Sequence, residues 1–129
     1  MEPINLKILY VEDDEDIREE MEIFLSLNFS ELIVASNGAE GIEKYREHRP
    51  ELIITDVMMP VMDGLEMIQN IKAEDGDKLC PLIVLTAFNK SDTNINDIKA
   101  LGITHIMAKP IDPFILQEKI ISIMKEKDA

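Results

Sequence analysis

The feature that most constrains the fold is a regular alternation between short apolar runs and longer amphipathic stretches. The apolar runs are continuous and rich in β-branched residues, which is typical of strands covered on both faces of a parallel sheet. We expect five such strands, at residues 6–11, 32–35, 52–57, 82–88 and 104–109. Because parallel strands need crossover connections, the stretches between them are expected to be helices.

Signals for helix starts and ends support the prediction that helices connect the strands. The first helix is expected after the cap Asp14, and the others within residues 37–50, 63–76, 91–102 and 112–127. Ser91 or Asp92 is expected to cap the fourth helix. In the first helix, apolar spacing predicts a buried stripe of Ile17, Met21, Phe24 and Leu25. Five strands alternating with five helices predict an α/β fold with one open parallel sheet.

Length and composition limit the remaining choices. The 129 residues are expected to form a single domain, with loose ends at residues 1–4 and 126–129. The net charge of −13 argues against direct contact with nucleic acid or a membrane, and it admits a divalent cation or a basic protein face. The single cysteine, Cys80, is expected to be a small buried hydrophobe. With no signal-peptide layout and no membrane-length apolar run, we expect a cytoplasmic protein.

Residues that can do chemistry follow the expected strands. In open α/β sheets, ligands bind at the carboxyl ends of the strands. The four strands that end on such residues contribute, in chain order, Glu12 and Asp13, then Asp56, then Thr86 and Ala87, then Lys109. The sequence therefore predicts that carboxylates, a hydroxyl and an ammonium meet at one edge of the sheet.

Carboxylates gathered in this way favour a cation. Two like charges about 4 Å apart repel by roughly 4 kcal/mol at an effective dielectric constant of about 20. A hard divalent ion with oxygen ligands, most plausibly Mg²⁺, relieves that repulsion. Asp56 would then stay ionised and could attack a phosphoryl group, with Lys109, the Thr86 hydroxyl and the Ala87 backbone N–H donating to the phosphoryl oxygens. The resulting mixed anhydride is labile, which suits a reversible switch.

The loop that follows Asp56 is suited to holding this carboxylate in place. Pro60 stiffens the loop, and Asp63-Gly64 turns the chain into the next helix. We therefore expect the strand-end carboxylate to be rigid and still accessible to solvent.

Four short motifs occur in order along the chain. They are "ED" at 12–13, "TDVMMPVMDG" at 55–64, "LTA" at 85–87 and "KP" at 109–110. Together, and over essentially the whole chain, they resemble the receiver domain of two-component response regulators, of the kind found in chemotaxis regulators. The resemblance implies a flavodoxin-like, doubly wound sheet with strand order 2-1-3-4-5.

The same resemblance implies a function. Asp56 would accept a phosphoryl group from the phosphohistidine of a sensor histidine kinase or a histidine phosphotransfer protein. Mg²⁺ would be held by Asp13, Asp56 and the carbonyl of Met58, with Glu12 acting through water, while Thr86 and Lys109 would bind the phosphoryl group. Catalysis would be limited to the protein's own phosphorylation and dephosphorylation.

The resemblance also implies a partner surface. The fourth helix, fifth strand and fifth helix would bind an effector protein or output domain, or a second copy of the chain. Apolar residues cover more than one stripe of the last helix, as expected either for a broad core contact or for a partner face. One departure concerns Ile106, which stands where many family members carry the Tyr or Phe that changes rotamer on activation. We expect Thr86 to move toward the phosphoryl group and Ile106 to repack behind it.

Two alternatives use the same strand-end acid or the same fold. A small Mg²⁺-dependent phosphatase with an aspartyl-phosphate intermediate, as in haloacid-dehalogenase-type enzymes, would need a second acid two residues after Asp56, and that position is Met58. A flavin or nucleotide binder would need a glycine-rich phosphate loop, which the sequence lacks.

Overall fold

The computed structural model describes residues 2–87 and 95–128. It contains a five-stranded parallel sheet with the strand order β2-β1-β3-β4-β5. The strands are β1 (Ile4–Val11), β2 (Phe29–Ala35), β3 (Leu52–Asp56), β4 (Leu82–Thr86) and β5 (Ile106–Ala108). The strand order confirms the predicted doubly wound, flavodoxin-like α/β fold.

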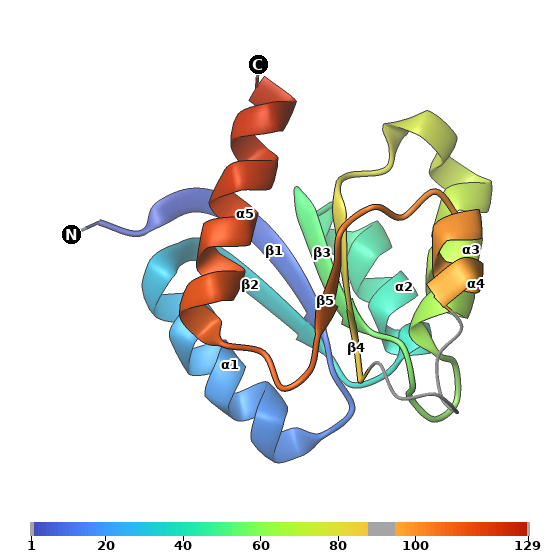
Figure 1. The fold of residues 1–129 in the computed structure, drawn as a ribbon, viewed down its shortest axis with the longest axis horizontal. Coiled ribbons are helices and arrows are strands. Elements are labelled where there is room, and N and C mark those ends of the chain that lie inside the picture. The colour runs from blue at the N-terminus through green and yellow to red at the C-terminus, as the bar shows by residue number, and fades with distance from the viewer. Residues whose placement is uncertain (1, 88–94, 129) are drawn as a thin grey trace.

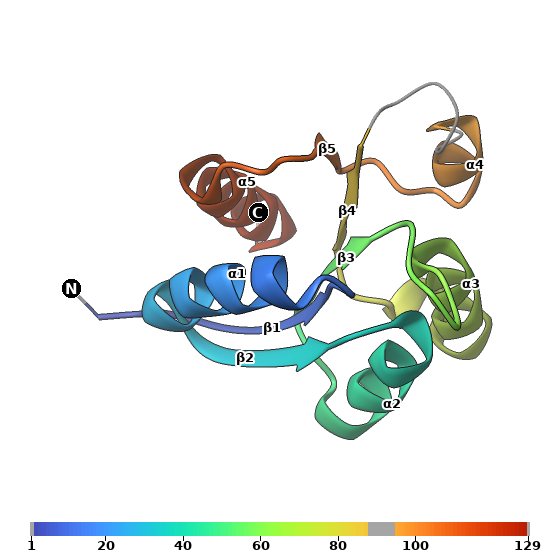
Figure 2. The same cartoon turned by 90° about the horizontal axis from the view of Figure 1, so that it is seen from below.

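Helices cover both faces of this sheet. They are α1 (Glu15–Asn28), α2 (Gly38–His48), α3 (Gly64–Asp75), α4 (Ile95–Ala100) and α5 (Pro113–Asp128), with a short 3-10 turn, η1 (Gly76–Lys78), after α3. Figures 1 and 2 show α1 and α5 on one face and α2 and α3 on the other. In the described ranges, no helix combines the length and the apolar character needed to cross a membrane.

Each face of the sheet has its own core, which explains why the strands carry apolar residues on both faces. Leu9, Val11 and Ile53 belong to the cluster that includes residues of α2, α3 and α4. Ile8, Tyr10 and other alternate residues belong to the cluster that includes residues of α1 and α5. Successive side chains of a strand point to opposite faces of the sheet. The continuous apolar runs therefore pack against helices on both faces, as predicted.

The helix starts follow the expected caps. The side chain of Asp14 accepts a hydrogen bond from the Ile17 backbone N–H at 3.0 Å, and Asp63 accepts one from Glu66 at 2.8 Å. Asp112 accepts one from the Phe114 backbone N–H at 2.8 Å. These bonds satisfy N–H groups that have no partner within the helix. The expected caps of the fourth helix, Ser91 and Asp92, lie outside the described residues.

Several predicted boundaries and burials are wrong. Ile4 is paired with Phe29 in the sheet, and α5 continues to residue 128, so β1 and α5 are longer than the predicted elements. The edge strand β5 has three residues because its pairing with β4 is limited to residues 106–108. Ile17 is 39% exposed and lines a surface cavity instead of the core. Cys80 is half-buried against the core, and this burial raises the pKa of its thiol to about 12.

The last helix divides its apolar residues between two environments. Leu116, Ile120 and Ile123 are buried in the core of the α1/α5 face. Phe114 is 70% exposed and contacts Phe24 of α1 edge-to-face, with ring centroids 5.5 Å apart. The broad apolar surface of α5 is therefore in part a core contact, as one of the two interpretations expected.

Candidate functional site

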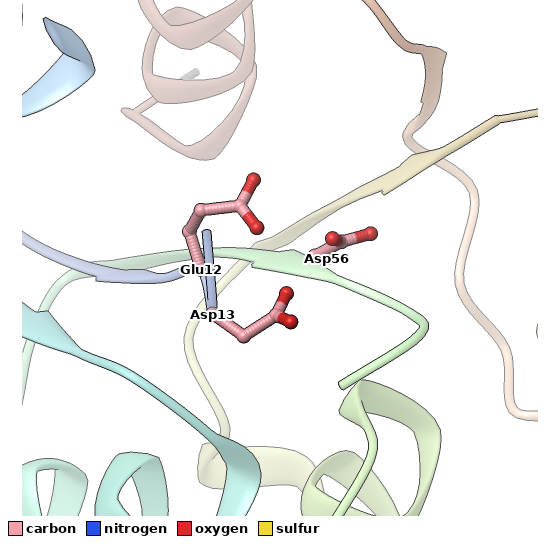
Figure 3. Close-up of side chains that lie close together, drawn as sticks. All are labelled: Glu12, Asp13 and Asp56. Carbon is pink, nitrogen blue, oxygen red and sulfur yellow. The ribbon is translucent and has the colours of Figure 1, made fainter. Parts of the chain in front are cut away.

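Three carboxylates converge at the carboxyl ends of β1 and β3 (Figure 3). These strands are neighbours, with Val11 opposite Thr55, so the residues that follow them lie side by side. Glu12, Asp13 and Asp56 each place one carboxylate oxygen within 4.8 Å of the others. Their burial differs: Glu12 is 1% exposed and Asp56 is 7% exposed, whereas Asp13 is open to solvent.

Lys109, which follows β5, joins the two buried carboxylates. Its Nζ donates to Oδ2 of Asp56 at 2.9 Å and to Oε1 of Glu12 at 3.0 Å. Its backbone N–H donates to the Thr86 carbonyl at 2.8 Å, which anchors the residue beside β4. Three carboxylates and one ammonium leave this group with two excess negative charges when all are ionised. A divalent cation would balance that excess.

Burial and charge act in opposite directions on these groups. Burial raises the pKa of Glu12, and the charge of Asp56 adds to the rise, while the hydrogen bond from Lys109 opposes it. Burial alone would lower the pKa of Lys109, but its hydrogen bonds with Asp56 and Glu12 raise that pKa overall. Lys109 therefore stays charged, and the ionised form of Glu12 depends on nearby donors.

The loop after Asp56 is held by short backbone contacts. Oδ1 of Asp56 accepts a hydrogen bond from the Val57 N–H at 2.8 Å, and the Gly64 N–H donates to the Val57 carbonyl at 2.8 Å. A Cβ atom at residue 64 would lie 2.1 Å from the Asp56 carbonyl oxygen. The glycine is thus required because the start of α3 presses against the end of β3, a stronger reason than the turn that the sequence predicted.

The other predicted residues also lie at this edge of the sheet. Thr86 ends β4 and is 1% exposed, and Ala87 follows it on the surface. Met58 comes two residues after Asp56, and its side chain is 57% exposed. The fold thus brings residues from four strand ends together, as expected, while the contacts of Thr86, Ala87 and Met58 with a ligand stay predictions.

Two residues at the site were missed by the sequence reasoning. Nη1 of Arg18 donates to the Glu12 carbonyl at 2.9 Å, which ties α1 to the end of β1. Tyr10 lies two residues before Glu12 and is fully buried. The two-residue spacing on a strand was the available signal, because it places both side chains on the same face of the sheet.

Comparison with known proteins gives one consistent family. Residues 8–121 match the model of the response regulator receiver domain. A probable transcriptional regulator, ycf27, from Pyropia yezoensis is 34% identical over 128 residues, which are 99% of this chain and 51% of the relative. The chain therefore spans about half the length of the curated relatives it matches.

Solved structures agree with this match. The chemotaxis protein CheY4 of Vibrio cholerae is similar with a TM-score of 0.82 and 30% identity, over 92% of this chain and 98% of that one. The CheY chain of a Borrelia burgdorferi complex with CheX, BeF3 and Mg²⁺ is similar with a TM-score of 0.76 and 27% identity, over 94% of this chain and 90% of the matched chain.

Proposed function

The chain belongs to the response regulator receiver domain family, and we propose that it is a phosphorylation-dependent switch whose phosphoryl acceptor is Asp56. The observation that carries the proposal is the convergence of Glu12, Asp13, Asp56 and Lys109 at one edge of the sheet. We assign residues 1–129 to a single receiver domain that acts in the cytoplasm, where a phosphorylated donor protein can reach it.

The acid cluster fits Mg²⁺, because three oxygen donors lie within 4.8 Å of one another and carry more charge than Lys109 neutralises. We assign Asp13, Asp56 and the Met58 carbonyl as ligands, with Glu12 acting through water. When bound, the ion supplies neutralising charge next to the reacting oxygen. The Borrelia burgdorferi relative was crystallised with Mg²⁺ and BeF3, which supports the same chemistry here.

Transfer of the phosphoryl group then follows from the side chains. A carboxylate oxygen of Asp56 attacks the phosphorus of a phosphohistidine, forming a P–O bond. The P–N bond breaks, and the imidazole nitrogen of the donor keeps the electron pair. The Lys109 ammonium, the Thr86 hydroxyl and the Ala87 backbone N–H donate to the phosphoryl oxygens. Later attack of water on the mixed anhydride restores the carboxylate and releases phosphate.

The donor and the output are also part of the proposal. The donor is a sensor histidine kinase or a histidine phosphotransfer protein. Thr86 moves toward the phosphoryl group, and the half-buried Ile106, one strand away, repacks behind it. This changes the surface of α4, β5 and α5, which binds an effector protein, an output domain or a second copy. The ycf27 relative is a probable transcriptional regulator about twice as long as this chain, which supports an output domain among these partners.

Intact mass tests the proposal. The wild type, incubated with Mg²⁺ and acetyl phosphate, is expected to gain one labile phosphoryl group, and EDTA is expected to prevent the gain. Asp56→Asn should show no gain, whereas Asp75→Asn, which changes an acid at the end of α3 that bonds to Tyr45 and Arg49, should behave like the wild type. Sustained turnover of nitrophenyl phosphate by the wild type, lost in Asp56→Asn, would instead support the phosphatase alternative.

A further inference from the structure

Tyr10 carries a buried polar group that has no part in the proposed phosphoryl transfer. The residue is 0% exposed, and its hydroxyl has no hydrogen-bond partner among the described residues. Among residues 2–87 and 95–128, the other buried side-chain atom in this condition is Nδ1 of His105, which lines a different cavity. Buried hydroxyls are nearly always satisfied, so an exception next to a functional site needs an explanation.

Tyr10 lines the same cavity as two members of the site, Glu12 and Lys109. Tyr10 and Glu12 are two residues apart and share one face of the sheet. Both line a cavity of about 240 Å³ beside α1, together with Lys109 and Pro110. Burial raises the pKa of Tyr10, and the nearby charge that adds most to this rise is that of Glu12. The phenol is therefore placed as a potential hydrogen-bond donor to Glu12.

Glu12 depends on donors that the proposed reaction would disturb. Its carboxylate accepts from Lys109 at 3.0 Å and, at a longer 3.3 Å, from the backbone N–H of Asp14. When the Lys109 ammonium turns to a phosphoryl group on Asp56, the shorter of these bonds weakens. The long bond from Asp14 and the water that we assign between Mg²⁺ and Glu12 then remain. A carboxylate has room for more than two hydrogen bonds, and one that is 1% exposed gains from a further donor because buried charge is costly unless it is well hydrogen-bonded.

We propose that Tyr10 is a positioning residue for this reaction: its hydroxyl donates to the Glu12 carboxylate once Lys109 has engaged the phosphoryl group. The inference rests on the proposed function. In the free protein the hydroxyl donates to no group of the described residues, and in the phosphorylated protein it donates to Glu12. Part of the preference for the phosphorylated state therefore comes from a group that touches neither the metal ligands Asp13 and Asp56 nor the phosphoryl oxygens.

The test uses the two tyrosines of the chain as a matched pair. Tyr10→Phe removes only the unpartnered hydroxyl, and Tyr45→Phe removes a hydroxyl that donates to Asp75. Binding of beryllofluoride, a phosphoryl mimic, would be measured in the presence of Mg²⁺. We expect Tyr10→Phe to bind on the order of tenfold more weakly than the wild type, the effect of one hydrogen bond to a charged group. Tyr45→Phe should bind like the wild type.

Two further readouts separate positioning from a structural role. Free Tyr10→Phe should be as stable to urea as the wild type or more stable, because the lost hydroxyl had no partner. Tyr45→Phe leaves Tyr10 as the one tyrosine in a chain without tryptophan, so its absorbance reports on that phenol alone. Beryllofluoride and Mg²⁺ should shift this absorbance to longer wavelength, as expected for a phenol that begins to donate to a carboxylate.

Equal beryllofluoride affinity in Tyr10→Phe and the wild type, or an unshifted Tyr10 absorbance on binding, would overturn the inference and leave the proposed function intact. A wild type that gains no phosphoryl group from acetyl phosphate and binds no beryllofluoride would overturn both. Weaker binding accompanied by a matching loss of stability in free Tyr10→Phe would also overturn the inference, because packing of the ring would then explain the result.

Discussion

Two clusters in this molecule combine a tyrosine with carboxylate side chains and one basic side chain. The outer cluster, Tyr45, Arg49 and Asp75, joins α2 to α3. There the Tyr45 hydroxyl and Nη1 of Arg49 both donate to Oδ2 of Asp75, the second at 2.6 Å. The hydrogen bond from Tyr45, followed by the charge of Arg49, lowers the pKa of Asp75. Every group in this cluster has a partner, and the acid is stabilised in its ionised form.

The edge cluster, Glu12, Asp13, Asp56 and Lys109 with Tyr10, has the opposite character. Two buried acids share one ammonium, and a third acid, Asp13, lies beside them. Burial raises the pKa of Glu12, and the Tyr10 hydroxyl has no hydrogen-bond partner among the described residues. The same residue types thus stabilise the fold in one place and leave unmet charge and an unused donor in the other. Unmet interactions of this kind are expected where a ligand completes the site. The predictions below test that contrast.

The largest effect is expected from Lys109→Met in EDTA. The variant leaves two buried carboxylates without their shared ammonium, so the free energy of unfolding should fall by about 3 kcal/mol. Mg²⁺ should restore much of the loss. The matched change in the outer cluster, Arg49→Met, removes an exposed cation and should have a smaller effect that Mg²⁺ does not alter. Urea unfolding of both variants, each in EDTA and in Mg²⁺, measures these changes. Equal losses of stability in the two variants, unaffected by Mg²⁺, would contradict the difference between the two clusters.

An intermediate effect is expected from pH. The pKa of Glu12 is raised in the folded protein above its ordinary 4.5, so between these two values the native state binds more protons than the unfolded chain. Its contribution to stability is therefore fully present below pH 4.5 and is lost as the pH rises through the folded pKa. Glu12→Gln should remove this dependence when metal-free protein is unfolded in urea at a series of pH values.

Asp75 should make stability depend on pH in the opposite direction in the same experiment. Its pKa is lowered below its ordinary 3.8, so its contribution is present above pH 3.8 and is lost as the pH falls further. Asp75→Asn should flatten the acidic end of the profile, where Glu12→Gln has no effect. If both variants changed the profile in the same pH range, the two clusters would not differ as described.

The smallest effect is expected from Tyr45→Phe, which should lower the free energy of unfolding by about 1 kcal/mol through the loss of one hydrogen bond to Asp75. Phosphorylation by acetyl phosphate should be unchanged. Thermal unfolding followed by circular dichroism measures the change in stability, and intact mass measures phosphorylation. A Tyr45→Phe protein as stable as the wild type would show that the outer cluster adds nothing to the fold.

The edge cluster could be located from the sequence because parallel strands end at the same edge whatever their side chains do. That rule alone placed Glu12, Asp56, Thr86 and Lys109 together. It could not show that Lys109 would bond to Glu12 as well as to Asp56, since that depends on rotamers in the absence of a ligand. The missing partner of the Tyr10 hydroxyl is likewise a property of packing in three dimensions.

The errors in the predicted strand lengths and burial also come from packing that the local sequence does not show. The length of β5 is limited by its pairing with β4, which leaves residues 104, 105 and 109 outside the strand although the local pattern extends over them. The periodicity of α1 included Ile17, but the first turn of that helix lines a cavity instead of the core. Local patterns predict which segments are strands and helices, and the neighbours of each segment decide where it ends and how deeply it is buried.

The central claim is that Asp56 accepts the phosphoryl group, and chemical trapping tests it most directly. Borohydride reduces an acyl phosphate to an alcohol, so a phosphorylated aspartate is recovered as homoserine in peptide mass mapping. After incubation with Mg²⁺ and acetyl phosphate, we predict homoserine at position 56 and none there in EDTA. Homoserine at position 13 instead, or at no acidic position despite a folded protein, would contradict the account.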